Sequence, residues 1–274
     1  MKTSKHWLIA LPAALIVIAL PTYAVDGVVL INQAAALAGN VTPGDMPGFP
    51  VTISAPGSYR LSGNLTVPNA NTTAIELTAD NVSIDLNGFS IIGPVVCSGV
   101  PVTSCGPTGT GSGINTKSAF GVAIFNGVIR GMGAFGIVTG ETVRIKEIRA
   151  FSNGQGGIFN DNGSVESSDA IQNGGTFGIT AFSSIANTAN FNGGNGILTF
   201  GIAVNNIAFH NHNDGIQTVF NATVSGNYAR DNGGAGINAG CPSSVVSNAL
   251  QGNSGGNIVT RGSGCVLANN APAP

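Results

Sequence analysis

Residues 187–197 read Asn-Thr-Ala-Asn-Phe-Asn-Gly-Gly-Asn-Gly-Ile, and both ends of this stretch recur along the chain. The phrase that opens it, Asn-x-Ala-x-x-Asn, returns at 206–211 and at 227–232. The pair Gly-Ile, which ends the stretch, recurs at intervals of 18 to 23 residues. A near-constant period of this length is typical of an array of small stacked units. The Gly-Ile pairs are Gly113-Ile114, Gly136-Ile137, Gly157-Ile158, Gly178-Ile179, Gly196-Ile197, Gly215-Ile216 and Gly236-Ile237.

Each unit has the pattern of short strands joined by turns. Apolar residues alternate with polar ones over a few positions, as around Val143, Ile145 and Val165, which favours strands over helices. A unit this small cannot bury its apolar side alone, but stacking buries it and pairs each strand with the next equivalent strand. The repeat therefore predicts an all-β parallel β-solenoid. A coil of about 20 residues with several corners fits the right-handed parallel β-helix, with roughly nine or ten coils here.

The asparagines that close each unit keep the same step as the glycines. In a parallel stack, equivalent side chains lie about 4.8 Å apart, so stacked charges repel while stacked Asn side chains can hydrogen-bond along the axis. This explains why only 8% of the residues are charged. We expect a structural Asn ladder, with Asn269 opening a truncated last copy of the phrase. The ladder members are Asn153, Asn173, Asn192, Asn211, Asn232 and Asn253.

With these repeats, residues 73–271 resemble the right-handed β-helix proteins of the pectate-lyase-like superfamily. The stretch Asn-Val-Ser-Ile-Asp-Leu-Asn-Gly-Phe at 81–89 also resembles the early coils of bacterial exported proteins of this kind. The resemblance implies the fold. It implies no single activity, because the superfamily includes lyases, hydrolases, epimerases, adhesins and scaffolds.

The first residues have the pattern of a secretory signal peptide, with cleavage expected after Ala24. Two lysines precede an apolar run, Leu8 to Leu20, that is shorter than the roughly 20 residues of a membrane span. No second long apolar run follows, so we expect no membrane span after cleavage and a secreted, cell-surface or periplasmic protein. The predicted divisions are a signal peptide over 1–24, an N-terminal cap segment over 25–60 and the β-helix domain over 61–274.

Four cysteines in an exported chain predict two disulfides. Cys97 and Cys105 bracket one short loop, which a bond between them would staple. Cys241 and Cys265 fall in what we predict to be adjacent coils, where a bond would protect the last coil from fraying.

The charges argue against nucleic acid as a partner, because ten Lys+Arg against twelve Asp+Glu leave no basic stripe for a phosphate backbone. Aligning neighbouring coils places Lys146 beside Glu166 and Arg149 beside Asp169. We therefore interpret the charges around these positions first as a surface ion-pair ladder.

A polysaccharide lyase would need acidic calcium ligands and a basic residue that abstracts a proton. Nothing in the sequence places such residues in one site. Calcium is expected only if the protein is a lyase, and no other cofactor is indicated. The candidates are Asp161, Glu141, Arg144 and Lys117.

His210, His212 and Asp214 lie in one turn, His-Asn-His-Asn-Asp. The turn could provide a weak metal site or an acid–base pair. The alternative is a solvated turn between coils, because no cysteine or third histidine nearby completes a metal shell.

The residue after each Gly-Ile should point outward if the isoleucine points inward. This column is more apolar than a solvated sheet requires. Phe182 and Phe200 stack two positions further along, with Phe220 close to the same place, and we expect an internal aromatic ladder there. An exposed apolar patch would instead mark a ligand face. The column reads Asn115, Val138, Phe159, Thr180, Leu198, Gln217, Asn238 and Val259.

Three functions are compatible with this sequence. The favoured one is an exported non-catalytic scaffold or binding protein, with a polysaccharide or another cell-surface component as its partner. The second is a polysaccharide-active enzyme, that is, a lyase, hydrolase or epimerase. The third is a self-assembling extracellular fibre subunit that associates end to end through an unprotected strand edge.

Overall fold

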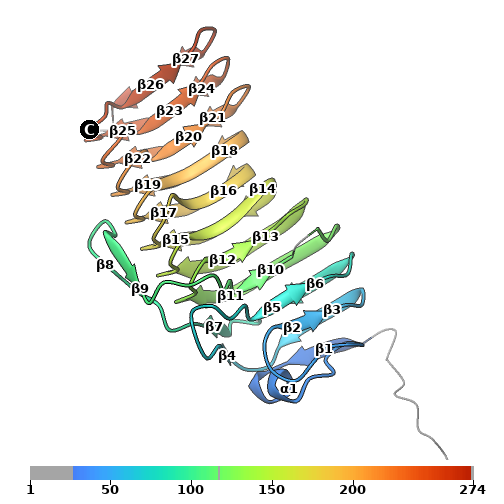
Figure 1. Ribbon diagram of the computed structural model, residues 1–274. Coiled ribbons are helices and arrows are strands. Elements are labelled where there is room, and N and C mark those ends of the chain that lie inside the picture. The colour runs from blue at the N-terminus through green and yellow to red at the C-terminus, as the bar shows by residue number, and fades with distance from the viewer. Residues whose placement is uncertain (1–26, 117, 273–274) are drawn as a thin grey trace, which may run out of the picture.

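The computed structural model describes residues 27–116 and 118–272. The predicted signal peptide and Lys117 lie outside this part of the chain. Within it, 26 strands pair into one continuous system of stacked coils, and one hairpin lies beside the stack (Figure 1). The hairpin consists of β8 (Val96–Ser98) and β9 (Ser104–Gly106). No helix in these two ranges is long and apolar enough to cross a membrane.

Each coil contributes to three parallel sheets, A, B and C, joined by three corners. Sheet A contains β2 (Val51–Ile53), β5 (Ile75–Leu77), β10 (Ile114–Asn115), β12 (Phe135–Val138), β20 (Ile216–Thr218), β23 (Ile237–Gly240), β26 (Ile258–Arg261) and the first parts of β14 (Gly156–Glu166), β16 (Phe177–Ile185) and β18 (Asn195–Val204).

Sheet B follows in every coil. It contains β1 (Val28–Ile31), β3 (Gly57–Leu61), β6 (Val82–Asp85), the first parts of β11 (Val122–Arg130) and β13 (Val143–Phe151), the last parts of β14, β16 and β18, and β21 (Thr223–Ser225), β24 (Ser244–Val246) and β27 (Val266–Ala268).

Sheet C completes the coil. It contains β4 (Leu65–Thr66), β7 (Ser90–Ile92), the last parts of β11 and β13, and β15 (Asp169–Ile171), β17 (Thr188–Asn190), β19 (Ile207–Phe209), β22 (Tyr228–Arg230), β25 (Ala249–Gln251) and β28 (Ala271–Pro272).

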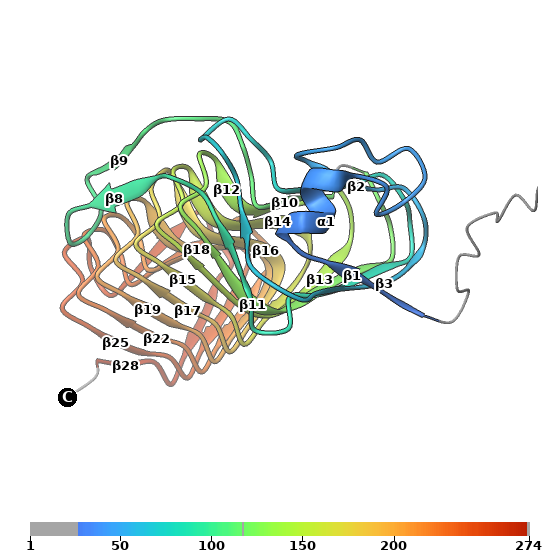
Figure 2. The same cartoon turned by 90° about the horizontal axis from the view of Figure 1, so that it is seen from below.

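The predicted β-solenoid is confirmed, with about 11 turns of about 21 residues rather than nine or ten of about 20. Coil pairing starts earlier than the repeat pattern indicates. β1 pairs with β3, and β3 pairs with β6, so part of the segment expected as a cap forms coils. The short helix α1 (Gln33–Ala38) lies across the N-terminal end of the stack (Figure 2). Its Ala36 is buried in the core.

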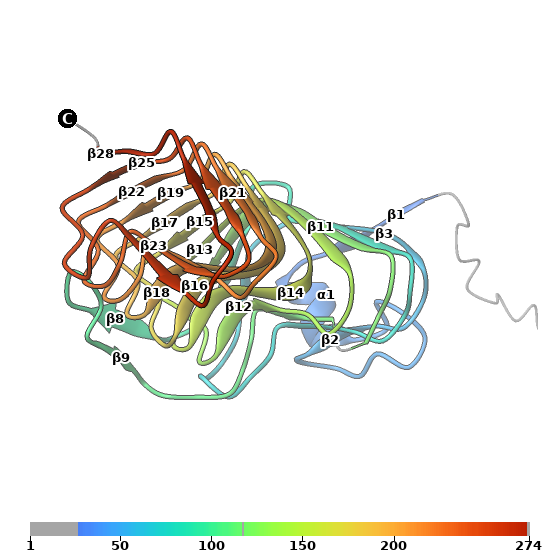
Figure 3. The ribbon, with the colours of Figure 1, turned by 90° about the horizontal axis from the view of Figure 1, so that it is seen from above.

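The core is a set of stacked columns of apolar side chains. The isoleucine of each Gly-Ile pair is buried, and register pairs Ile197 with Ile216 above it. On sheet C the inward position is almost always alanine, from Ala150 to Ala229. At the C-terminal end no described element covers the last coil (Figure 3). Leu267 there is 51% exposed, whereas Val245 at the same position one coil below is fully buried.

The predicted Asn ladder is present at the corner between sheet C and the next sheet A. In every member but Asn253, the last, the amide group is buried and bonds to the next coil, as Asn192 Nδ2 does to Asn211 Oδ1 at 2.9 Å. Asn192 Nδ2 also donates to Ala170 O, and its Oδ1 accepts from both nitrogens of Asn173. The same bonds join all six predicted members, from Asn153 to Asn253.

A second buried ladder runs along the corner between sheets B and C. It consists of the asparagines that open the repeated phrase, and Asn206 Nδ2 donates to Asn227 Oδ1 at 3.0 Å. Its last member is Asn270 rather than Asn269, since Asn248 Nδ2 donates to Asn270 Oδ1. Asn269 instead takes the left-handed position that precedes each ladder residue, with a φ of 54°. The members are Asn187, Asn206, Asn227, Asn248 and Asn270.

The ladder explains why glycine precedes the core isoleucine. A Cβ atom on Gly196 would lie 2.6 Å from Asn211 Nδ2 and 2.6 Å from Gly215 O. Real Cβ contacts are never that short, and here the obstacle includes backbone. The asparagine phrase and the Gly-Ile pair of the repeat therefore depend on each other. The asparagine inside the corner of one coil leaves no room for a side chain at the glycine of the coil below.

Both predicted disulfides are formed. Cys97–Cys105 joins β8 to β9 inside the hairpin, while Cys241–Cys265 joins the coil of β23 to the coil of β26.

Replacing Asn192 with Ala should lower the free energy of unfolding by about 2 to 4 kcal/mol, because buried partners above and below lose their hydrogen bonds. Urea unfolding followed by circular dichroism measures this. Thr188→Ala is the matched control: Thr188 lies half-buried on β17, the strand that precedes Asn192, and should change stability by no more than about 0.5 kcal/mol. Equal stability of the two variants would contradict the structural role of the ladder.

The double variant Cys241→Ser/Cys265→Ser should melt several degrees below the wild type. The bond closes a loop of 24 residues at the end of the stack, for which loop entropy gives about 3 kcal/mol. Cys97→Ser/Cys105→Ser should have a smaller effect on melting of the stack, because that bond lies within one hairpin. If calorimetry gives the first variant the wild-type melting temperature, the bond does not hold the last coil.

Candidate functional site

The corner between sheets A and B differs from the two ladder corners because its length changes by several residues between coils. Pairing across β14, β16 and β18 is in register up to this corner and shifts there. Three residues separate Asn160 from Ser164 in one coil, while only Phe182 separates Ala181 from Ser183 in the next. The shorter corner recedes, and this leaves a hollow in the surface.

This hollow, which we call the corner groove, has a volume of about 510 Å³ and crosses four coils. Apolar backbone and side chains form much of its surface, with uncharged polar groups and one arginine among them. Its lining residues are Gly121, Val122, Ala123, Thr142, Val143, Arg144, Asn162, Gly163, Ser164, Phe182 and Ser183.

The most exposed phenylalanine rings of the described residues lie along this corner. In the described ranges, the phenylalanines with highly exposed side chains are Phe120 at 54%, Phe182 at 50% and Phe220 at 57%. Phe182 lines one end of the groove, and Phe120 precedes Gly121 at the other end. The ring of Phe182 lies against Gly201 of the next coil, where a Cβ atom would lie 2.8 Å from the ring.

The expected internal aromatic ladder is therefore wrong. Phe182 and Phe220 point into solvent, and Phe200 is half-buried. The reason is the corner itself. Ala181 and Ser184 take the inward positions on either side of the corner, so Phe182 between them must point outward.

A buried amide fixes the floor of the groove. Asn160 Nδ2 donates to Val143 O at 2.8 Å and to Ser164 O, and its Oδ1 accepts from Thr139 Oγ1 at 2.9 Å. These bonds join the backbone of two neighbouring coils directly beneath Gly163. The sequence reasoning missed Asn160 and Phe120, because this corner varies in length and so has no period to mark its residues.

The charged residues near the groove are partly paired. The predicted register is confirmed, since Lys146 aligns with Glu166 and Arg149 with Asp169. The ion pairs differ from that alignment: Arg144 pairs with Glu166 at 3.4 Å, and Lys146 pairs with Glu147, its own neighbour, at 3.0 Å. Arg144 and Lys146 also line a second hollow of about 310 Å³, together with Phe125.

The candidate catalytic residues lie along the same corner. Glu141 and Asp161 are half-buried and immediately precede the groove residues Thr142 and Asn162, in consecutive coils. Arg144 lines the groove itself. Lys117 lies outside the described residues. The fold thus places two carboxylates beside one groove, an arrangement that the spacing in the sequence does not reveal.

The turn at residues 210–214, the candidate metal site, makes contacts that stabilise the stack. Asp214 accepts from Ala235 N and from Asn238 Nδ2, both at 2.7 Å, so both of its oxygens bond to the coil above. His210 stacks on Phe191 with ring centroids 5.6 Å apart, and His212 is exposed. Across the described ranges, no three His, Cys, Asp or Glu side chains are grouped so that they could hold a metal.

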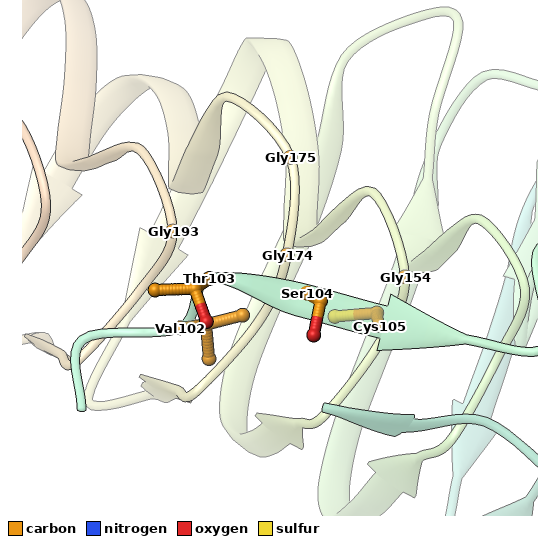
Figure 4. Close-up of a pocket in the computed structure, with 8 residues that line it drawn as sticks. All are labelled: Val102, Thr103, Ser104, Cys105, Gly154, Gly174, Gly175 and Gly193. Carbon is orange, nitrogen blue, oxygen red and sulfur yellow. The ribbon is translucent and has the colours of Figure 1, made fainter. Parts of the chain in front are cut away.

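The hairpin of β8 and β9 lies over the corner between sheets C and A (Figure 4). Its Val102 donates a backbone hydrogen bond to Phe191 O, although the two residues belong to distant segments. A Cβ atom on Gly174 would lie 2.7 Å from Cys105 Sγ, so the hairpin needs glycine beneath it. A cavity of about 200 Å³ remains between the hairpin and the glycines Gly154, Gly174, Gly175 and Gly193.

The column after each Gly-Ile is mostly half-buried on the outside of sheet A. Thr180 departs from this pattern because it is buried, and Val259 in the last coil is exposed. Phe159 packs against Phe135 with ring centroids 5.7 Å apart. These rings cover one another, so this face offers less open aromatic surface than the corner groove.

No family model and no curated protein matches this chain. Among solved structures, the Dettilon tailspike protein is similar over 80% of this chain, with 17% identity and a TM-score of 0.55. The A-module of the mannuronan C-5 epimerase AlgE4 from Azotobacter vinelandii is similar over 81% of this chain, with 16% identity and a TM-score of 0.49. The match covers 52% of the tailspike chain and 73% of the epimerase module.

Identities this low support the shared fold and nothing finer. Stacked parallel coils, two continuous asparagine ladders and the similarity to the tailspike lead to one assignment: the chain is a right-handed parallel β-helix protein.

Proposed function

We propose that this protein is an exported, non-catalytic binding protein whose corner groove holds a neutral polysaccharide. The observation that carries the proposal is that the three most exposed phenylalanines of the described residues lie along the corner of the groove. Sugar rings present an apolar face that packs on aromatic side chains, and concave sites with a few polar groups are the usual ligand sites of proteins. Phe120 and Phe182 would hold the two ends of the bound segment.

The dimensions of the groove favour a polymer over a small molecule. Phe120 and Phe182 lie three coils apart, which corresponds to about 14 Å at a strand spacing of about 4.8 Å. The groove follows the axis of the stack, so a chain could continue past either ring. Phe220 lies two coils beyond Phe182 on the same corner, outside the lining of the groove.

The polar groups of the groove favour an uncharged ligand. Thr142, Asn162 and Ser164 offer neutral donors and acceptors, and the one arginine, Arg144, already pairs with Glu166. Two disulfides fit an oxidising compartment outside the cytoplasm, in agreement with the expected signal peptide.

Phe182→Ala should weaken binding of a neutral polysaccharide about tenfold, which equals about 1.4 kcal/mol. A panel of neutral polymers screened by affinity electrophoresis identifies a ligand, and calorimetry with an oligosaccharide of it gives the Kd. Phe220→Ala is the matched control: it removes an equally exposed ring two coils outside the groove and should change Kd less than twofold. An equal loss in both variants would mean that the groove is not the site, and so would no loss in either.

A polysaccharide-active enzyme is the second candidate, because Glu141 and Asp161 lie beside the groove in consecutive coils. Two carboxylates beside a bound chain are the usual requirement for glycoside hydrolysis, and together with calcium they would suit a lyase. The ion pair between Arg144 and Glu166 weighs against this function, since it engages the one basic residue that lines the groove.

The protein should leave the chain length of neutral and acidic polysaccharides unchanged, with and without calcium. Size-exclusion chromatography of the polymers after incubation measures this. Shortening by the wild type that disappears in both Asp161→Asn and Glu141→Gln would replace the binding function with an enzymatic one. Circular dichroism of the variants checks that they fold.

A further inference from the structure

The outer face of sheet C carries a line of arginine and aromatic side chains that the corner groove does not involve. Strand register places one residue of each successive coil in a single outward column. The column continues to Ile92 on one side and Gln251 on the other, and within it two arginines bracket four residues, two of which are phenylalanines. This bracketed part of the column, which we call the sheet C strip, reads Arg130, Phe151, Ile171, Asn190, Phe209 and Arg230.

The guanidinium groups lie on the rings of this strip. Arg130 and Arg149 both approach the ring of Phe151, with their Cζ atoms 6.0 and 5.9 Å from its centroid. Arg230 lies 5.8 Å from the centroid of Phe209. Contacts of this kind place a cation over an aromatic face while leaving the N–H groups at its edge free to donate.

Neighbouring aromatic side chains hold Phe209 in place. Phe191 meets it edge-on with centroids 5.6 Å apart, and His210 lies 4.1 Å away. Both Phe151 and Phe209 remain half-exposed, so part of each ring faces solvent.

The strip is positively charged on a chain whose net charge is negative. Arg130 and Arg149 take part in none of the ion pairs formed among the described residues. The acidic residues on this face are Asp169, which aligns with Arg149, and Asp231, which pairs with Arg230 at 2.7 Å. The hydrogen bond with Tyr228 and then the charge of Asp231 raise the pKa of Arg230, so its guanidinium stays charged.

We propose that the sheet C strip binds an acidic polysaccharide, with the carboxylates of the chain on Arg130 and Arg230 and its sugar rings on Phe151 and Phe209. The chain would lie along the stack axis. Five coils separate the two arginines and three separate the two phenylalanines, or about 24 and 14 Å at a spacing of about 4.8 Å. Arginine binds carboxylates through paired N–H groups, and aromatic faces accept sugar rings.

This surface is independent of the corner groove. The groove has rings at its ends and one arginine, Arg144, which pairs with Glu166, whereas the strip places Arg130 and the adjoining Arg149, neither of them in an ion pair of the described residues, beside the ring of Phe151. The two surfaces lie on different faces of each coil, and they would distinguish ligands by charge.

The experiment uses two polymers with the same backbone. Carboxymethyl cellulose carries carboxylates and hydroxyethyl cellulose carries none. The protein should bind carboxymethyl cellulose at least tenfold more tightly than hydroxyethyl cellulose. Its affinity for carboxymethyl cellulose should fall as the salt concentration rises from 50 to 200 mM, because salt screens the attraction between charges more strongly over this range. Arg130→Gln/Arg230→Gln should lower the affinity at least tenfold and reduce the salt dependence.

Arg60→Gln/Arg261→Gln is the matched control, because it removes two cations from other faces and should change the affinity less than twofold. Thermal melting confirms that both proteins fold. Equal losses in the two double variants would mean that overall charge rather than the strip binds the polymer, and no loss in the strip variant would also overturn the proposal. Equal binding of the two celluloses would overturn it too.

Two further measurements separate this proposal from its alternatives. Phe182→Ala should leave carboxymethyl cellulose binding unchanged, since that residue belongs to the corner groove; a loss there would move the acidic ligand to the groove. Phosphatidylglycerol vesicles should not compete with the polymer. Competition that the strip variant abolishes would instead assign the strip to a membrane surface.

Discussion

The buried asparagine ladders are the interaction on which the rest of the structure depends. A narrow coil with alanine along one of its three faces turns sharply, and each turn leaves backbone groups inside that water cannot reach. The asparagine amides bond to those groups and to one another, coil after coil. They also hold the preceding residue in the left-handed region, even where that residue is Ala186 or Phe191, which do not favour it. A continuous network of this kind is stronger than its separate bonds.

The same constraint decides where the surface can vary. Two corners carry ladders and change little in length where the ladders run: the corner between sheets B and C is constant, and the corner between sheets C and A gains one residue only between Ile171 and Ile179. The corner between sheets A and B has no such repeat, and its length changes between neighbouring coils. The most exposed phenylalanine side chains of the described residues and the corner groove lie along it. The rigid corners therefore support the variable one, which is the usual division between scaffold and binding surface.

This division also explains what could be predicted from the sequence. The ladders and the Gly-Ile columns depend on the next coil, so a period of about 20 residues shows them directly. Phe182 points outward because the corner of its coil is shortened to one residue. The repeat does not show this, because the length of this corner differs between coils. The contact between Val102 and Phe191 joins segments far apart in the chain, which a repeat cannot reveal. The terminal ladder residue was misplaced by one position, at Asn269, because the last coil is longer than those before it.

A rigid stack with open-ended surfaces suits a polymer better than a small molecule. Binding costs less when the surface is already ordered, and here backbone pairing and buried amides order every coil before a ligand arrives. Each coil adds one step of about 4.8 Å, so contacts repeat along the axis as units repeat along a polysaccharide. Single contacts can then be weak, because a long chain meets several of them at once. The faces of the stack differ in how their arginines are paired. On sheet B, Arg60 forms an ion pair with Asp85. On sheet C, Arg130 lies beside the ring of Phe151 and forms no ion pair with the other described residues. One fold can in this way present two surfaces that differ in the charge of the polymer they accept.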